Sequence, residues 1–342
     1  MTTPSDGIAL PSTERPEPVT PRARRRGWSL RAHLIAVVLV TIALVILAGV
    51  LVTAKDYGRA RDEAVRNARF EAKLAAHDLS TSIPDLRALI VRSGASLGQV
   101  TGANLAAFPI DRCNLSFASF RNFTSGVLHI VLPDGSVLCS SGQQQVPPGT
   151  RPYAGAQWLT PVIQKSSATV VGPLIDPVTK KFSLFVAAPI PAPGAPPDAQ
   201  PPGALAVTLD LTPLASELST AFGSSQYSGN ELEYLVTVAK RDRIVSRSSQ
   251  PAASSAKTVS AASFAKADSR RGALLRDPDG TERLFVGDTV AELNWHVYAG
   301  ISKTAVYAPA RAALRDNLTS GLIVVIGVAL VALAGIFTVA RR

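Results

Sequence analysis

The chain has 342 residues, of which 46% are hydrophobic, and its formal net charge is +10 at pH 7. The positive charge does not indicate nucleic acid, because much of it is arginine beside two apolar segments and the remainder of the chain mixes both signs. The four histidines are far apart and no paired-cysteine or H-E-x-x-H spacing occurs, so we expect no metal site and no cofactor.

Two apolar segments lie near the ends of the chain. Residues 1–33 are a polar, proline-rich tail that we expect to be disordered. Residues 34–52 follow without a charge, and residues 318–340 are a second apolar segment. At about 1.5 Å per residue, each is long enough to cross a hydrocarbon core of about 30 Å. The first is too long for the apolar part of a cleaved signal peptide, which predicts an uncleaved anchor.

Arginines flank both predicted spans. Five precede the first span, between Arg22 and Arg31, and Arg341 and Arg342 follow the second. Lys and Arg beside a membrane span stay in the cytoplasm. We therefore expect a two-pass protein of the cell membrane, with both termini cytoplasmic and residues 53–317 outside.

Residues 53–92 are predicted to form a long helix after the first span. Small and apolar side chains recur every three or four residues on one face, from Tyr57 to Ile90. The alanines from Ala60 to Ala75 would let a second copy approach closely, so we expect a homodimer seam there, with a plain stalk as the alternative. Proline inside a helix removes a hydrogen bond, so Pro84 should kink or break this one.

Ten short strands are predicted next, in two similar groups. In the first group, two strands flank the turn Pro133–Gly135, two more flank residues 176–180, and a fifth covers residues 204–211. The second group has two hairpins within residues 232–288 and a last strand at 295–301. Two hairpins and a closing strand, occurring twice, indicate a duplicated α+β module with antiparallel sheets.

The chain has two cysteines, Cys113 and Cys139, both in the part expected outside. An even number in an oxidising compartment favours a disulfide between them. Two buried free thiols are the alternative.

The order of these elements resembles the double Cache sensor domains of bacterial transmembrane receptors, over roughly residues 54–317. Short motifs agree with this resemblance. Cys113 with Val137–Ser141 resembles a C…G-x-V-x-C-S-S pattern, and Thr150–Tyr153 resembles a DRPY pocket motif. The run from Val171 to Ile190 resembles VG…DP-x-T-x-K…A-x-P-I, and Asn294–Val297 resembles a terminal W-x-V strand.

The resemblance implies two tandem PAS-like antiparallel-sheet modules on a long N-terminal helix, flanked by two transmembrane helices. It divides the exported part into a distal module at residues 93–222, a proximal module at 223–302 and a return helix at 303–317, with residues 341–342 at the cytoplasmic end. It also implies that a small molecule binds outside and that a signal crosses the membrane. Such receptors usually carry their output after the second span, so we expect a longer chain or a cytoplasmic signalling partner.

Four residues are candidates for the ligand pocket. Arg151 offers a planar guanidinium that suits a ligand carboxylate, and Asp176 suits a ligand amine. Tyr153 and Trp158 offer apolar faces with polar tips. Each residue also has an alternative, purely structural role. Arg151 would form a surface ion pair, Tyr153 and Trp158 would belong to the core, and Asp176 would form a turn. In the motif, Thr150 replaces an acidic residue and Ala154 replaces an aromatic one, so we expect an altered pocket.

One string, Gly94 to Gly98, fits the G-x-S-x-G pattern of serine hydrolases and would make Ser96 a nucleophile. A nucleophile elbow needs a strand before the serine and a helix after it. The preceding residues are predicted to be helical, which favours instead a turn at a helix C-terminus, with Gly94 as its glycine. The sequence therefore predicts a sensor without catalytic residues, with a membrane-anchored hydrolase and a non-signalling binding protein as the alternatives.

Overall fold

The computed structural model describes most of the chain. The described residues are 30–101, 105, 115–142, 146–147, 149–196, 199–223, 226–227, 231–238, 240, 242–249, 259–268 and 270–341. The chain divides into two compact units, one of which is Leu51–Asp316 and the other of which combines the two ends, Met1–Val50 and Asn317–Arg342. The predicted disordered tail lies outside the described residues up to position 29.

Two helices supply the apolar segments of the chain. Helix α1 spans Leu30–Thr101 and helix α7 spans Ala308–Ala340. Each contains a stretch long and apolar enough to cross a membrane, and none of that stretch is buried inside the protein. Large apolar side chains exposed all around a helix are what a lipid environment accommodates. The two helices fit a two-pass membrane protein with a domain between the spans.

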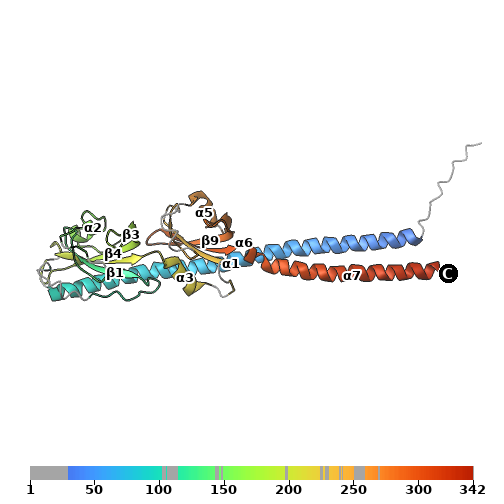
Figure 1. Ribbon diagram of the computed structural model, residues 1–342, viewed down its shortest axis with the longest axis horizontal. Coiled ribbons are helices and arrows are strands. Elements are labelled where there is room, and N and C mark those ends of the chain that lie inside the picture. Colours follow the sequence, from blue (N-terminus) through green and yellow to red (C-terminus); the bar gives the residue numbers. More distant parts are fainter. Residues whose placement is uncertain are drawn as a thin grey trace, which may run out of the picture. The chain divides into compact units, whose positions relative to one another are not determined.

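The unit Leu51–Asp316 contains two five-stranded antiparallel sheets (Figure 1). The strands of the first sheet are β1 (Gly126–Val131), β2 (Val137–Ser140), β3 (Thr169–Ile175), β4 (Phe182–Ile190) and β5 (Gly203–Asp210). The strands of the second sheet are β6 (Leu232–Thr237), β7 (Ile244–Arg247), β8 (Ala273–Arg276), β9 (Glu282–Val290) and β10 (Trp295–Ser302).

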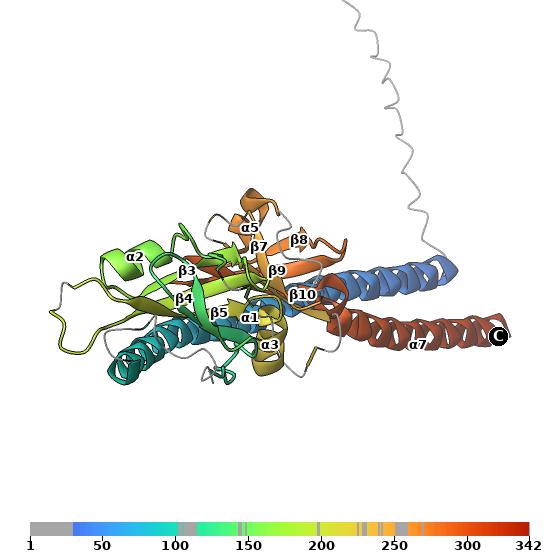
Figure 2. The ribbon, with the colours of Figure 1, turned by 60° about the vertical axis from the view of Figure 1, so that its left-hand side comes forward.

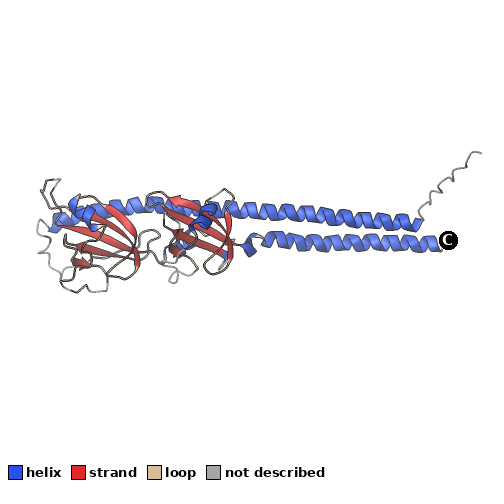
Figure 3. Ribbon diagram, turned by 90° about the horizontal axis from the view of Figure 1, so that it is seen from above, coloured by secondary structure: helices blue, strands red, loops and turns tan. Residues whose placement is uncertain are grey.

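The two sheets have the same topology. Their strand orders are β2-β1-β5-β4-β3 and β7-β6-β10-β9-β8, so in each sheet the closing strand lies between the two hairpins. Figure 3 shows the two sheets as two separate groups of strands. The duplicated antiparallel module and the α+β fold class predicted from the sequence are confirmed. The exact limits of the two modules stay a prediction.

Four short helices lie among the described residues of the domain. They are α2 (Leu159–Gln164), α3 (Leu214–Phe222), α5 (Ala261–Ala267) and α6 (Lys303–Val306). Helix α2 contacts β4 and β5, and α5 contacts β8 and β9. In Figure 2, α2 lies over the first sheet. Neither α2 nor α5 was predicted from the sequence, because six or seven residues are too few to show a helical period.

Alternating side chains give each sheet two apolar faces. In β4, Leu184 and Val186 join the core that contains α1, whereas Phe185 joins a separate cluster with α2. In β9, Leu284 joins the core with α1, whereas Phe285 joins a cluster with α5. This is the two-residue period of a strand that is buried on both sides. We call the two sides the α1 face and the outer face of each sheet.

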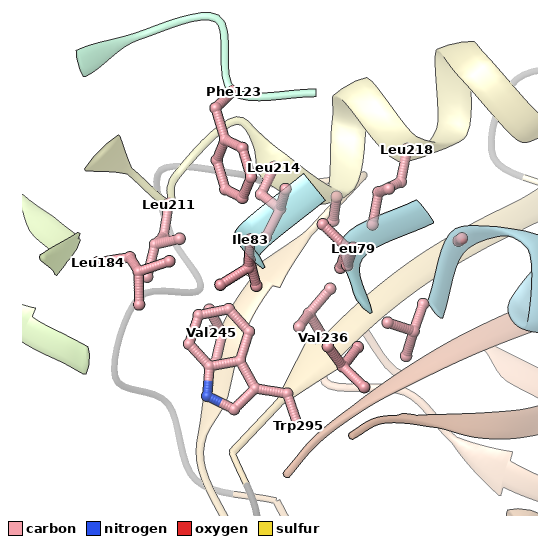
Figure 4. Close-up of a cluster of buried hydrophobic side chains, with 14 of the residues drawn as sticks. Leu79, Ile83, Phe123, Leu184, Leu211, Leu214, Leu218, Val236, Val245 and Trp295 are labelled. Carbon is pink, nitrogen blue, oxygen red and sulfur yellow. The ribbon is translucent and has the colours of Figure 1, made fainter. Parts of the chain in front are cut away.

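Helix α1 is shared by the two modules. Leu79 and Ile83 of α1 lie in a buried cluster with Leu184 of the first sheet and with Val236 and Trp295 of the second (Figure 4). The hydroxyl of Ser246 on β7 also accepts from the backbone N–H of Ala215 on α3, at 3.0 Å. The two modules are therefore joined through a common core rather than by a linker alone.

The alanine-rich face of α1 lies inside this core. Ala64, Ala68, Ala72 and Ala75 are at most 2% exposed and pack in the cluster that contains both sheets. Their small side chains let α1 lie close to the chain's own strands. Our prediction that a second copy would pack on this face is therefore wrong.

Helix α1 also runs past two predicted interruptions. It continues through Pro84 and ends at Thr101. A Cβ added at Gly94 or Gly98 would clash with a backbone carbonyl oxygen, that of Pro189 or Pro191 respectively. These glycines allow α1 to pack against the end of β4, so the predicted helix terminus at Gly94 is wrong.

The two cysteines are only partly described. Cys139 lies buried in β2. Cys113 lies outside the described residues. The disulfide between them stays a prediction.

The shared core predicts a large cost for a cavity at Ile83. Ile83→Ala should lower the free energy of unfolding by about 2–5 kcal/mol, because the surrounding side chains come from several elements and cannot all collapse into the space. Urea unfolding of the purified chain in detergent measures this. Leu89→Ala, on the same helix but 40% exposed, is the matched control and should cost about 0.5 kcal/mol. Equal effects of the two substitutions would contradict the assignment of Ile83 to the shared core.

Candidate functional site

An aromatic cluster lies on the outer face of the first sheet. Tyr153 and Trp158 come from the segment between β2 and α2, and Phe185 comes from β4. The ring of Tyr153 lies edge-on to the other two, with centroids 5.3 Å from Trp158 and 6.2 Å from Phe185. Trp158 and Phe185 stack with centroids 5.8 Å apart. All three side chains are buried, which agrees with the core alternative for the two predicted aromatic residues.

The β1–β2 hairpin positions the segment that carries Tyr153. The backbone N–H of Tyr153 donates to the carbonyl oxygen of Gly135, at 3.1 Å. Gly135 has a φ of +88°, and a Cβ there would clash with the backbone of Ala154. Glycine is therefore needed both for the turn and for the approach of the segment that covers the outer face.

Asp176 is buried between Tyr153 and the β3–β4 turn. Its Oδ1 accepts from the Tyr153 hydroxyl at 2.9 Å and from the backbone N–H of Val178 at 3.0 Å. Its Oδ2 accepts from the hydroxyl of Thr179 at 2.7 Å and from the backbone N–H of Thr179 at 3.2 Å. Burial and the neighbouring Asp176 raise the pKa of Tyr153 well above its usual value, so the hydroxyl remains a donor. Four donors already occupy this carboxyl group, which acts as a turn residue and holds Tyr153.

His129 lies on β1 beside this cluster and was not among the predicted site residues. Its ring centroid is 5.6 Å from that of Tyr153. The imidazole is fully buried, and neither ring nitrogen has a hydrogen-bond partner among the described residues. Burial lowers the pKa of His129 to about 4, against the opposing effect of Asp176. The side chain is therefore a neutral, unpaired imidazole at pH 7.

One signal in the sequence could have identified His129. The strand VLHIVL alternates, which places His129 with Val127 and Val131 on one side of the sheet. A single polar residue on an apolar face is worth examining even without a second ligand at a recognisable spacing. His129 has no second histidine at a metal-ligand spacing, so no motif predicted it.

Arg151 lies apart from the buried cluster. Its side chain is 65% exposed, and its Nε lies 3.0 Å from Oδ2 of Asp134. Hydrogen bonds from Ser136 lower the pKa of Asp134, and Arg151 adds a smaller effect. Of the four predicted residues, the structure brings together Tyr153, Trp158 and Asp176, whereas Arg151 forms a surface ion pair.

Ser96 lies inside α1, so a helix and not a strand precedes it. It lines an apolar groove of about 640 Å³ between α1 and residues 115–120. A serine in the middle of a helix does not have the strand–turn–helix context of a nucleophile elbow. The hydrolase alternative therefore lacks its structural basis.

No family model matches the chain, and no curated relative was found. Among solved structures, the ligand-binding domain of the Pseudomonas fluorescens chemoreceptor CtaA in complex with L-serine is similar, with a TM-score of 0.50 and 16% identity over 71% of this chain and 99% of that one. The ligand-binding domain of the Pseudomonas aeruginosa PAO1 amino acid chemoreceptor PctB in complex with L-Gln gives a TM-score of 0.45 and 15% identity, over 75% of this chain and 98% of that one.

At 16% identity, the similarity to the CtaA domain bears on the fold and not on the ligand. It agrees with the long α1 and with the repeated strand order of the two sheets. It also agrees with the resemblance carried by the sequence motifs. The chain has the fold of the double Cache sensor domains of bacterial receptors.

Proposed function

We propose that this chain is a membrane-anchored small-molecule sensor whose ligand binds at the outer face of the first sheet. The observation that carries the proposal is the buried imidazole of His129, which has no hydrogen-bond partner among the described residues. A buried polar group left unpaired costs about 1–3 kcal/mol. Most buried polar groups in a protein core have hydrogen-bond partners, and the exceptions are expected at functional sites.

The chemistry of the site suits a small molecule that carries both donors and acceptors. A neutral imidazole offers one N–H donor and one nitrogen acceptor. The similar CtaA domain was solved with L-serine, which has both kinds of group. We therefore propose an amino acid, or another small molecule with a carboxylate or an amine, as the ligand class.

Arg151 is proposed to hold a carboxylate of this ligand. The ion pair with Asp134 is exposed on both sides. An exposed pair is worth only about 0–1 kcal/mol. Arg151 can therefore leave Asp134 for a ligand at little cost, and its position two residues before Tyr153 places it on the segment that covers the outer face.

Ligand entry requires the covering segment to move, because Tyr153 and Trp158 are both buried. A ligand shifts such an equilibrium only by the difference between its affinities for the two conformations. We propose that binding selects one position of this segment, that the change reaches α1 and α7, and that the output lies in a cytoplasmic partner or a following module. In this proposal both termini are cytoplasmic, as the flanking arginines indicate.

The buried His129 predicts a loss of stability in mild acid. Its pKa is about 4 in the folded chain, against 6.5 for the ordinary side chain. The folded state therefore binds fewer protons between these values, so the contribution of His129 is fully present above pH 6.5 and is lost progressively as the pH falls towards 4, by about 3 kcal/mol at most. His129→Leu should remove this part of the pH dependence. Urea unfolding of both chains at pH 7, 5.5 and 4.5 measures it, and identical pH profiles would sink the assignment.

The proposed ligand class predicts a difference between the two partners of the Arg151 ion pair. Calorimetric titration of the chain in nanodiscs with the standard L-amino acids should find at least one that binds. Arg151→Ala should then weaken binding by about tenfold or more, since it removes a charge-assisted hydrogen bond. Asp134→Ala is the matched control and should leave affinity unchanged or higher. If Arg151→Ala and Asp134→Ala bind the ligand equally well, Arg151 is not part of the site. If no standard amino acid binds, an amino acid as the ligand is contradicted.

A homodimer remains part of the proposal, on a different face of α1. Phe70 and Leu74 are 63% and 36% exposed. With His77 and Thr81 they follow steps of four, three and four residues, which is the spacing of a two-helix seam. Two copies anchored in one membrane are parallel and have a high effective concentration, so a short seam is enough.

Cysteine cross-linking distinguishes the two faces of α1. Phe70→Cys and Leu74→Cys should give disulfide-linked dimers in oxidised membranes, because these side chains point away from the core. Ala68→Cys and Ala72→Cys, on the buried face, are the matched controls and should give none. The unsubstituted chain is treated in the same way, to measure any dimer formed through Cys113 or Cys139. Cross-linking at position 68 in preference to 70 would contradict the burial of the alanine face.

A further inference from the structure

Five charged side chains meet on the outer face of the second sheet. Glu233 lies on β6, Arg247 on β7 and Arg283 on β9, while Asp277 and Asp279 belong to the β8–β9 turn. The first three and Asp277 have side chains at most 1% exposed, and that of Asp279 is 19% exposed. We call these residues the five-charge cluster.

The two arginines share the three carboxyl groups. Arg247 donates through Nε to Oε1 of Glu233 at 3.0 Å, and its Nη2 lies 2.9 Å from Oδ1 of Asp277. Arg283 donates through Nε to Oδ2 of Asp277 at 2.9 Å. Both Nη2 atoms lie 3.4 Å from Oδ2 of Asp279. Asp277 is therefore the carboxyl group held between the two guanidinium groups.

The charges of the five-charge cluster do not cancel. Two arginines face three carboxyl groups, which leaves one negative charge in excess when all are ionised. The charged groups that act on Asp277 are Glu233, Arg247, Asp279 and Arg283, and no further cation is among them. Oδ1 of Asp277 and Oε2 of Glu233 contact the arginines only as ion pairs, at 2.9 Å from Nη2 of Arg247 and 3.9 Å from Nη2 of Arg283, and neither oxygen accepts an aligned hydrogen bond among the described residues. Uncompensated buried charge is costly, and a group in that position takes up a proton instead.

We propose that the five-charge cluster is a proton-binding site, through which acidity outside the membrane acts on the second module. A hydronium ion in the surrounding water gives one proton to a carboxylate oxygen of Asp277, so that one O–H bond breaks, another forms, and a water molecule is left. Uptake makes the cluster neutral. It also weakens the attraction of Asp277 for Arg247 and Arg283, which are the contacts that tie β7 and β9 to the β8–β9 turn.

The electrostatics of the individual groups agree with this site. Burial, followed by the neighbouring Glu233, raises the pKa of Asp277 to about 6, while the two arginines oppose the rise. Burial would also raise the pKa of Asp279, but hydrogen bonds from Thr281 and the arginines lower it overall. Asp279 thus stays ionised and, being partly exposed, links the cluster to water.

Among the described residues of the first module, no equivalent charge cluster occurs at this position. Asp176 and Asp277 each begin the turn of the corresponding hairpin, two residues after Leu174 and Leu275. Leu174 pairs with Ser183 across the first hairpin, whereas Leu275 pairs with Arg283 across the second. Arg283 is thus replaced by an uncharged residue in the first module. The five-charge cluster is specific to the second module and does not depend on the proposed ligand site.

The test is the pH dependence of unfolding for the full chain in nanodiscs and its Asp277→Asn variant. A carboxyl group with a raised pKa binds more protons when folded, so its contribution to stability grows as the pH falls through 6. The folding equilibrium constant of the unsubstituted chain should rise about tenfold relative to that of Asp277→Asn between pH 7 and pH 5. His129 also titrates in this range but is present in both chains, so its effect cancels in the comparison.

Two further variants make the test decisive. Glu282→Gln, on the same hairpin, removes an exposed carboxyl group whose pKa is lowered by Lys303 and which titrates below this range, so it should keep the pH profile of the unsubstituted chain. Glu233→Gln also removes the excess negative charge, so its folding equilibrium constant should not show the tenfold rise. This variant provides the test if Asp277→Asn does not fold. An unchanged pH profile in either Asp277→Asn or Glu233→Gln overturns the proposal.

Discussion

The packing of α1 against both sheets is the constraint on which the rest of the domain depends. Small side chains from Ala64 to Ala75, followed by Leu79 and Ile83, fill one continuous core with strands from both modules. This helix covers the α1 face of each sheet with mostly apolar side chains. The unpaired His129 and the five-charge cluster both lie on outer faces, one in each module. Both sheets that carry these groups pack on the same helix.

The two modules share one topology, and the proposals give them opposite responses to acid. His129 is neutral when folded, so acidification works against the first module. Asp277 is readily protonated when folded, so acidification favours the second module. Since both sheets pack on α1, a change in either module is felt by the same core. In the proposed sensor, external acidity therefore shifts the balance between the modules instead of simply stabilising or destabilising the whole domain.

Much of the fold could be predicted from the sequence, because alternation within short strands and the turn at Pro133–Gly135 are local signals. The alanine face of α1 was assigned wrongly because small side chains suit close approach by the chain's own strands or by a second copy, and periodicity does not distinguish these. His129 has no spacing motif. Glu233 and Arg283 are far apart in sequence and meet only through the register of β6, β10 and β9. Sites whose residues are brought together by the register of a sheet cannot be predicted from a single sequence.

The motif residues of the first module show how one side chain can serve both the fold and the proposed site. Asp176 holds the β3–β4 turn through Val178 and Thr179 and, with the same carboxyl group, accepts from the Tyr153 hydroxyl. The segment that covers His129 is thereby tied to the far edge of the sheet. In the proposed sensor, that segment cannot open without breaking this buried hydrogen bond or moving the turn with it. Asp176 is fully buried, so water cannot replace the lost bond. In the proposed sensor this bond therefore separates a closed from an open arrangement, and a ligand at His129 shifts the balance between them.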